Sequence, residues 1–310
     1  MSPRAASRRG SAPTAGGITI GSLLDEAERR LEEREVEFPD TSALWLMSAV
    51  VGALDDPDAL TERRTEPVDA AAEVRFREFL ARREAHEPYQ YIVGVSDFRD
   101  VLMEVESGVF VPRSQSERLC DEIEEWAESR PRPKGGWRIA ELGAGCGAIA
   151  VSLALGPLAP RRVWAVDVSL QALELVRRNA RRHKVEKRVV PLAGDWLEWS
   201  RAEPRFDMIV AVPPYLNPGD EIYLSEESLR WEPMDTFFGE PSGDDLLRGL
   251  ADAAGRRLRP GGLFACQIDS DQVEMLEEHV NGDPDHPLTI EWVLADDEDD
   301  EDAILAVRTG

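Results

Sequence analysis

The stretch VAVPPYLN, residues 210–217, has the composition of a rigid contact point for a flat ligand. Proline has no backbone N–H and a fixed φ, so Pro213 and Pro214 must end the preceding apolar strand in a stiff elbow directly after Val212. The carbonyl oxygen of Pro213 cannot turn away and can accept an N–H from a ligand, while the Tyr215 ring can stack on a planar group. Methyl transfer to a planar nitrogen needs these parts, because it depends on positioning and on removal of water.

A second stretch, RIAELGAGCGAIA at residues 138–150, is suited to close backbone contact with a ligand. A predicted strand runs into Gly143, Gly145 and Gly147, and an apolar helix follows at once. Alternating glycines allow a tight turn and bring the amides of a helix terminus to the ligand. Gly143, Gly145 and Ala148 also fit the G-x-G-x-x-G/A dinucleotide fingerprint, so a nicotinamide enzyme and a purely structural turn both stay open.

Two further strand ends carry residues suited to a nucleoside. Asp167 closes the strand in VWAVDVS, where a carboxylate can accept hydrogen bonds from both ribose hydroxyls, in NAD and in S-adenosylmethionine alike. Its alternative role as a helix cap suits Ser169 better. Asp195 and Trp196 follow another predicted strand, and an acid beside a flat apolar ring suits an adenine; a Trp packed on a helix explains the ring equally well.

The elements that must position these sites alternate in type from Trp137 onward. We expect strands at 137–142, 163–168, 206–212 and 263–268, further strands near 188–193, 289–294 and 303–308, and helices at 147–155, 169–183 and 243–258. This alternation predicts an α/β, Rossmann-like, mostly parallel sheet that binds its ligand beyond the carboxyl ends of the strands. Pro-Pro-Tyr at the mouth of such a sheet favours a methyltransferase over a dehydrogenase.

A small helical domain is predicted at residues 18–88, before the sheet. Ser22 is expected to cap LLDEAERRLEERE, with Asp25 three residues on, and further helices are expected at about 41–54 and 68–85. Its expected roles are substrate docking or bundle packing.

Three other segments complete the predicted organisation. Residues 89–111 indicate a β-hairpin linker to the main domain, 112–310. Residues 1–17 are basic and contain no acid, which favours a disordered tail over a transit peptide because no amphipathic stripe is visible. The acidic run 296–302 is expected to be a solvated loop, since it has neither the spacing nor the glycine of a calcium loop.

Composition excludes several classes of function. The net charge of −25 disfavours general nucleic-acid binding, although a local basic groove stays possible, and it fits solubility or high-salt adaptation as well as a partner-related role. The three cysteines (Cys120, Cys146 and Cys266) are too scattered for a disulfide framework or a zinc site, which indicates a reduced, cytosolic protein. The four histidines show no metal spacing, and no apolar run approaches the ~20 residues that span a bilayer.

From Ile18 onward the chain resembles the release-factor glutamine methyltransferases, the PrmC/HemK family. The resemblance rests on ITIGSLLDEAERRLEE, EPYQYIVG, SDF, SGVFVPRSQSE, ELGAGCGAIA, AVDVS, GDW, VPPY, RWEPMDTFFGEPSG and LRPGGLF. It implies a seven-stranded class I methyltransferase fold with an N-terminal helical domain of the bacterial type. It also implies a cytoplasmic enzyme that uses S-adenosyl-L-methionine, releases S-adenosyl-L-homocysteine, and methylates the side-chain amide nitrogen of a glutamine in a peptide-release factor.

The resemblance implies roles for individual residues by position. The cofactor would contact Glu141, near its amino group, and Gly143, Ala144, Gly145, Cys146, Gly147, Asp167, Asp195, Trp196 and Val212. The acceptor would lie against Val212, Pro213, Pro214 and Tyr215, with Phe98, Arg113, Glu117 and Glu232 around the pocket.

Three departures from the family pattern concern the acceptor. The family has Asn where this chain has Val212, and valine cannot accept the second amide N–H. The usual PRPETE reads PRSQSE, and the Glu-Ile-Gly after the fifth strand reads Gln267 to Asp269. A redirected enzyme, acting on a peptide, an amine or a specialised metabolite, is therefore the main alternative, and the net charge makes a nucleic-acid base the least favoured acceptor.

Overall fold

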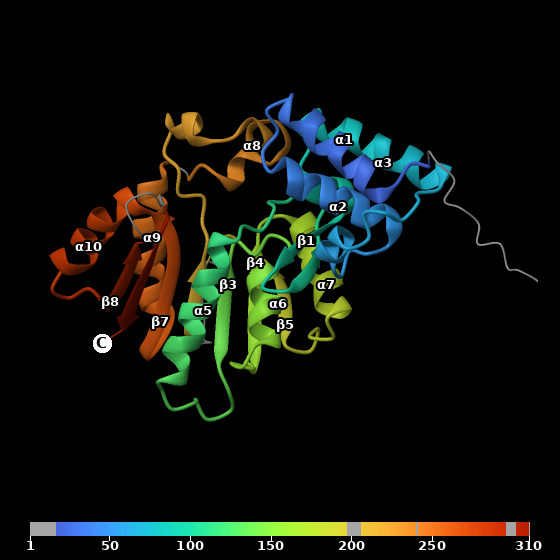
Figure 1. Ribbon diagram of the computed structural model, residues 1–310. Coiled ribbons are helices and arrows are strands. Elements are labelled where there is room, and N and C mark those ends of the chain that lie inside the picture. Colours follow the sequence, from blue (N-terminus) through green and yellow to red (C-terminus); the bar gives the residue numbers. More distant parts are fainter. Residues whose placement is uncertain (1–16, 197–205, 240, 296–301, 310) are drawn as a thin grey trace, which may run out of the picture. The chain divides into compact units, whose positions relative to one another are not determined.

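The computed structural model describes residues 17–196, 206–239, 241–295 and 302–309. It divides into two compact units, Met1–Val93 and Gly94–Gly310, each with its own core (Figure 1). The boundary falls after Val93 rather than at Pro88. The predicted disordered tail lies outside the described residues except for Gly17, and the acidic run does so except for Asp302.

The first unit is helical. It contains α1 (Ile20–Glu32), α2 (Pro39–Val51), the 3₁₀ turn η1 (Pro57–Thr61), α3 (Ala70–Arg83) and the short α4 (Tyr89–Val93). Helix α1 begins three residues earlier than predicted, because Thr19 rather than Ser22 is its N-cap. The Thr19 hydroxyl accepts the Ser22 N–H at 3.2 Å, and the Ser22 hydroxyl accepts the Thr19 N–H at 2.9 Å. This reciprocal pair satisfies two backbone donors at the helix start.

The predicted hairpin over residues 89–111 is wrong at its start, because residues 89–93 form α4. The Pro88 carbonyl accepts the Ile92 N–H at 3.2 Å, and Tyr89 stacks on Trp45 at 6.0 Å between ring centroids. Ile92 is buried in the core of the helical unit. Packing against this core therefore overrides the β-propensity of the aromatic and β-branched residues.

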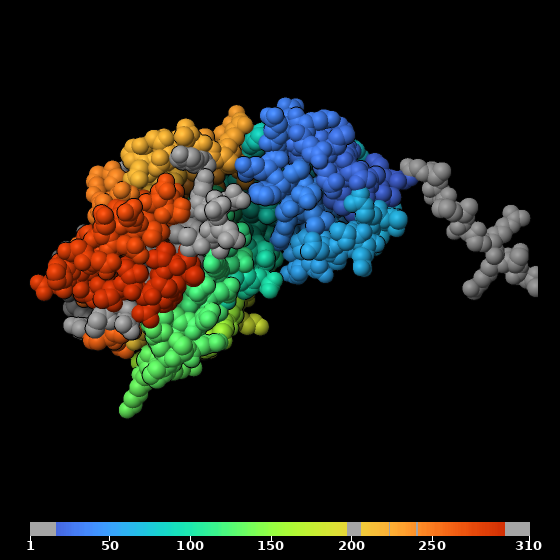
Figure 2. Space-filling model, turned by 60° about the vertical axis from the view of Figure 1, so that its left-hand side comes forward, coloured from blue at the N-terminus to red at the C-terminus, as the bar shows by residue number. Residues whose placement is uncertain are grey.

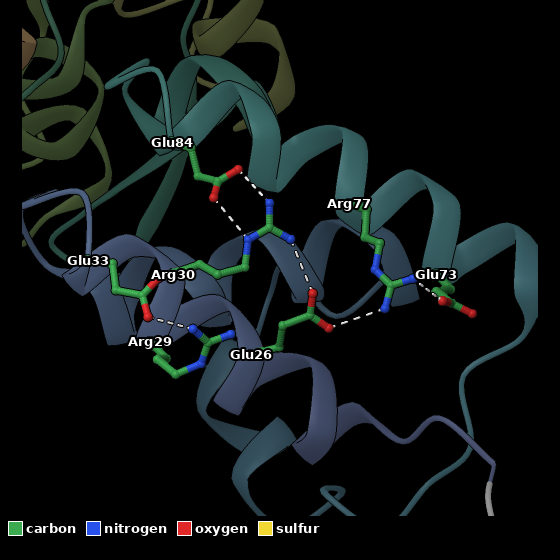
Figure 3. A network of polar contacts seen from close by, with 7 residues as sticks. All are labelled: Glu26, Arg29, Arg30, Glu33, Glu73, Arg77 and Glu84. Atoms are coloured by element: carbon green, nitrogen blue, oxygen red, sulfur yellow. Dashed lines mark hydrogen bonds and ion pairs between the residues drawn. The ribbon is translucent and has the colours of Figure 1, made fainter.

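Ion pairs join α1 to α3 on the surface of the helical unit (Figure 3). Arg30 donates to both oxygens of Glu84 at 2.9 and 2.6 Å and to Glu26 at 3.1 Å. Arg77 donates to the other oxygen of Glu26 at 3.2 Å. These partly exposed pairs set the register of two helices, and their contribution to stability is small because solvent screens them.

A buried arginine ties the inner side of the same unit together. Arg83 is 1% exposed, and its guanidinium donates to the Ser42 hydroxyl at 2.9 Å and to the carbonyl oxygens of Glu87 at 3.0 Å and Glu37 at 2.8 Å. One buried side chain thus joins polar groups of α2 and of two loops.

We predict that Arg83→Met destabilises the helical unit, because it removes the donor from the buried Ser42 hydroxyl and Glu87 carbonyl and the link to the Glu37 carbonyl. The expected loss in free energy of unfolding is about 2–4 kcal/mol. Urea denaturation of the full chain, followed by hydrogen exchange of the α2 and α3 amides, measures it. Arg29→Met is the matched control, because Arg29 makes an exposed pair with Glu33 and should change stability by less than about 1 kcal/mol. Equal stabilities of the two variants would contradict the assignment.

The second unit is built on a mostly parallel seven-stranded sheet, as predicted, and its strands lie in the order β5-β4-β3-β6-β7-β9-β8. Its strands are β3 (Arg138–Leu142), β4 (Arg162–Asp167), β5 (Val189–Ala193), β6 (Phe206–Ala211), β7 (Leu258–Asp269), β8 (Leu288–Ala295) and β9 (Asp302–Thr309). Strand β9 runs antiparallel to both of its neighbours, β7 and β8, and the pairs from β5 to β7 are parallel. A separate hairpin of β1 (Val95–Phe98) and β2 (Val101–Glu104) turns at Arg99 and Asp100, which both have the positive φ that two-residue hairpin loops require.

Helices cover both faces of this sheet (Figure 1). They are α5 (Gln115–Glu128), α6 (Ala148–Leu155), α7 (Leu170–Arg182), α9 (Gly243–Arg257) and α10 (Val273–Gly282). The connection between β6 and α9 contains α8 (Glu226–Trp231) and the 3₁₀ turns η2 (Asp220–Tyr223) and η3 (Met234–Thr236), and the 3₁₀ turn η4 (Ser270–Gln272) follows β7. The crossovers through α6 and α9 move in opposite directions across the sheet, so right-handed connections place these helices on opposite faces. The space-filling view shows the red C-terminal segment against the green segment that contains α5 (Figure 2). An ion pair of 2.5 Å between Arg130, after α5, and Glu291 of β8 joins these two parts of the chain.

The strand register brings the sequence sites to one edge of the sheet. Leu142 of β3 lies opposite Val166 of β4 and Ala211 of β6, and Ala211 lies opposite Cys266 of β7. The next residue along each chain segment therefore lies in one row across this edge, directly after the ends of β3 and β6 and within the last residues of β4 and β7. That row consists of Gly143, Asp167, Val212 and Gln267.

Candidate active site

A cavity of about 770 Å³ opens at this row of strand ends, within the second unit. Most of the predicted site residues line it: Phe98, Arg113, Glu141, Gly143, Ala144, Gly145, Cys146, Asp167, Trp196, Val212, Pro213, Pro214 and Tyr215. Four predicted residues are not among its lining: Glu117, Gly147, Asp195 and Glu232. The glycine turn and the proline elbow therefore line the same cavity.

The glycine turn after β3 requires left-handed backbone. Gly143, Gly145 and Gly147 have φ of 72°, 52° and 84°. Gly147 is the N-cap of α6, and a Cβ on it would lie 3.1 Å from Val176. Its role is therefore to turn the chain and to let α6 pack closely on α7. This packing role agrees with its absence from the cavity lining.

Asp167 joins two loops at the cavity. Its carboxylate oxygens accept the Gly145 N–H and the Ser169 N–H, both at 2.8 Å. Ser169, as the sequence suggests, is the cap of α7, and its hydroxyl accepts the Ala172 N–H at 3.2 Å. Burial raises the pKa of the Asp167 carboxyl, and the two backbone hydrogen bonds lower it in part.

Glu141 is the most buried acid of the cavity, at 2% exposed. One oxygen accepts the Ala150 N–H at 3.0 Å from the first turn of α6. Burial raises the pKa of this carboxyl well above its usual range. A nearby cation would favour the ionised form of this carboxyl.

The proline elbow is held rigidly from behind. The Tyr215 carbonyl accepts a hydrogen bond from Gln272 Nε2 at 2.8 Å, and the same nitrogen donates to Asp244 at 2.8 Å. A Cβ at Gly243 would collide with the Tyr215 carbonyl oxygen, so only glycine allows α9 to begin there. Pro213 is buried, which keeps its backbone in a fixed position next to the cavity.

Glu232 acts on the cavity through Arg113 instead of lining it. Glu232 is buried, accepts the Val111 N–H at 3.0 Å and the Ser228 hydroxyl at 3.2 Å, and forms an ion pair with Arg113. The Arg113 guanidinium also lies over the Phe110 ring, 4.7 Å from its centroid. The carboxylate therefore fixes the orientation of Arg113, the one arginine that the described residues contribute to the cavity lining.

Ser116 and Gln267 are cavity residues that sequence reasoning marked only as departures from a pattern. The Ser116 hydroxyl donates to Gln267 Oε1 at 2.8 Å, and both side chains are buried. Residues of α5 and β7 thus form one pair in the cavity wall. Their separation along the chain hides the pairing, because neither local spacing nor residue type indicates it.

The one group of side chains that lies close enough to share a metal, within the described residues, is Asp252, His279 and His286. Both histidine Nε2 atoms contact the same Asp252 oxygen, at 2.9 and 3.1 Å. The Leu288 N–H donates to His286 Nδ1 at 3.2 Å, so the neutral ring keeps its proton on Nε2 and has no lone pair there for a metal. The group joins α9 to α10 outside the cavity lining.

None of the helices in the described part of the chain has the length and apolar content needed to cross a membrane. This finding agrees with the sequence, in which no apolar run is long enough.

Comparisons with known proteins agree with this arrangement. The family model of the PrmC N-terminal domain matches residues 22–94, and that of the methyltransferase small domain matches residues 130–228. A release factor glutamine methyltransferase of Moorella thermoacetica is 36% identical over 262 residues, covering 84% of this chain and 89% of that protein. One of Bordetella pertussis is 38% identical over 211 residues, covering 68% of this chain and 75% of that protein.

A solved structure, that of a methyltransferase from Pyrococcus furiosus, has the same fold. Its TM-score is 0.50 at 18% identity, over 74% of this chain and 99% of that one. The identity and coverage of the sequence relatives, together with the cavity that joins a glycine turn to a proline elbow, lead to one assignment: this chain is a methyltransferase and belongs to the family of release factor glutamine methyltransferases.

Proposed function

We propose that this enzyme transfers a methyl group from S-adenosylmethionine to the side-chain amide nitrogen of a glutamine in a peptide-release factor. The names of its relatives support the acceptor. The observation that carries the proposal is the single cavity that contains the glycine turn, Asp167 and the elbow at Pro213 and Tyr215. The net change at the acceptor is replacement of one N–H by N–CH₃, with release of a proton.

The residues around the glycine turn fit S-adenosylmethionine. Positive φ at Gly143 and Gly145 brings backbone to the cavity surface without a side chain in the way. Asp167 is suited to ribose hydroxyls and Glu141 to an ammonium group, and both line the cavity. Trp196 supplies the flat ring for an adenine, whereas the exposed Asp195 stands outside the lining. When bound, the cofactor supplies an electrophilic methyl group on a sulfonium, which is a good leaving group.

The elbow would hold the acceptor. The Pro213 carbonyl accepts one amide N–H, and the Tyr215 ring packs on the amide plane. The hydrogen bond from Gln272 to the Tyr215 carbonyl holds the Pro213 carbonyl and the Tyr215 ring in place before the acceptor binds. Less entropy is then lost when the acceptor is oriented. The chain's contribution is therefore positioning and exclusion of water.

Val212 supports a second candidate, in which the same chemistry acts on a nitrogen with a single N–H. This side chain lines the cavity and has no hydrogen-bond acceptor. Such a nitrogen, in an amine or a specialised metabolite, needs only the Pro213 carbonyl. A glutamine amide would instead leave its second N–H unpaired.

Incubation of the purified enzyme with labelled cofactor and a bacterial peptide-release factor tests the function. Mass spectrometry is expected to find a singly methylated glutamine. If the enzyme binds S-adenosylhomocysteine and yet forms no methylated glutamine, the acceptor is wrong and the second candidate gains support.

We predict that Val212→Asn raises kcat/KM for the glutamine acceptor about tenfold or more, since it supplies the missing acceptor for the second N–H. Steady-state methylation with purified release factor measures the change. Val212→Ala is the control, because it alters size without adding an acceptor, and it should bring no gain. An unchanged kcat/KM in Val212→Asn would show that a side chain at position 212 does not bind the second amide N–H.

We also predict that binding of S-adenosylhomocysteine releases a proton and weakens as pH falls. Burial raises the pKa of Glu141, which favours its protonated form in the free enzyme. The ammonium group of the ligand binds the carboxylate form, so binding releases the proton. Affinity is therefore full above the raised pKa and is lost as pH falls through it. Calorimetry from about pH 8 to about pH 5.5, in buffers of different ionisation enthalpy, measures both effects. Loss of proton release in Glu141→Gln supports the assignment, and an unchanged release contradicts it.

A further inference from the structure

Gln267 presents an unused hydrogen-bond donor to the cavity. The side chain lies on β7, is 4% exposed and lines the cavity. Its Oε1 accepts the Ser116 hydroxyl at 2.8 Å, which leaves the amide nitrogen directed away from Ser116. Among the described residues, no acceptor contacts Gln267 Nε2.

This nitrogen faces open space and is not sealed in the core. It is not one of the four buried side-chain atoms that lack a partner in the described part of the chain. Because the residue is otherwise buried, the accessible surface of Nε2 belongs to the cavity. A nearly buried amide whose oxygen is fixed by another residue is a pre-oriented donor for a ligand oxygen.

The donor lies beside the elbow. Ala211 and Cys266 are opposite each other on parallel strands, so the next residues lie side by side: Val212 directly after the end of β6, and Gln267 still within β7. Both line the cavity. The apolar Val212, directly before Pro213, thus has the polar Gln267 of β7 as its neighbour.

We propose that Gln267 Nε2 binds the carbonyl oxygen of the acceptor amide while the Pro213 carbonyl binds one of its N–H groups. This inference rests on the proposed function, because it assumes an amide acceptor. A primary amide has a donor and an acceptor on one edge, and Gln267 with Pro213 presents the complementary pair. Recognition through that edge does not use the second N–H, which matches the absence of an acceptor at Val212.

The contact selects and orients the acceptor and does not activate it. A hydrogen bond to an amide oxygen draws electron density from the nitrogen, so it cannot raise the nucleophilicity of that nitrogen. Its value is binding and alignment. Its loss should therefore appear in KM for the acceptor much more than in kcat.

The test is Gln267→Glu, which keeps the size of the side chain, can still accept from Ser116, and replaces the donor by an anionic oxygen. We expect KM for the release factor to rise about tenfold or more, with kcat within about threefold of wild type. Binding of S-adenosylhomocysteine should stay within about twofold. Ser116→Ala is the second variant: it releases the Gln267 amide from its fixed orientation, and a smaller rise in KM is expected.

The matched control is Asn281→Asp, the same exchange of an amide for a carboxylate at an exposed position of α10 outside the cavity lining, which should leave all constants unchanged. Weakened S-adenosylhomocysteine binding in Gln267→Glu, with an unchanged KM for the acceptor, would mean that Nε2 serves the carboxylate of the cofactor, and it overturns the proposal. Unchanged constants in both Gln267→Glu and Ser116→Ala overturn it as well, while the function stands. Absence of glutamine methylation by wild-type enzyme is the distinct result that removes the proposed function and this inference together.

Discussion

The site depends first on one carboxylate that holds two loops together. Asp167, at the end of β4, accepts the backbone N–H of Gly145 from the turn after β3 and that of Ser169 at the start of α7. The carbonyl of Val166, one residue earlier, accepts the N–H groups of Gly143 and Ala144 at 3.0 and 2.9 Å. Two neighbouring strand ends are thereby locked to each other. The left-handed glycine turn can persist because these bonds satisfy its amides, and it leaves a bare backbone surface at the cavity.

The second constraint is the rigidity of the elbow on the other side of the same cavity. Proline limits the backbone at residues 213 and 214, and close contact with Gly243 and the hydrogen bond from Gln272 hold Tyr215. Both parts are built before any ligand arrives. Methyl transfer to an unreactive amide nitrogen gains most from such preorganisation, because the protein has little acid–base chemistry to contribute and must supply alignment. Parallel strands in register make this possible, since they bring residues that are distant in sequence into a single row at one edge of the sheet.

Much of this arrangement could be predicted from the sequence, because short-range rules control it. Strand and helix alternation predicts the seven-stranded sheet, and the strand ends predict which side chains meet. The errors occur where tertiary packing decides. YQYIV has the composition of a strand but becomes α4, since Ile92 is buried in the helical core. Thr19 replaces Ser22 as the cap, because a reciprocal pair of hydroxyls satisfies more donors than one. Glu232 and the Ser116–Gln267 pair act across long sequence distances, which no local pattern encodes.

A crystal structure with S-adenosylhomocysteine and a glutamine peptide from a release factor tests the central claim most directly. The account predicts that the glutamine amide nitrogen lies about 3 Å from the Pro213 carbonyl oxygen, on the side that faces the cofactor sulfur. A complex in which the amide nitrogen points away from Pro213, or in which the glutamine lies outside the cavity, would contradict it.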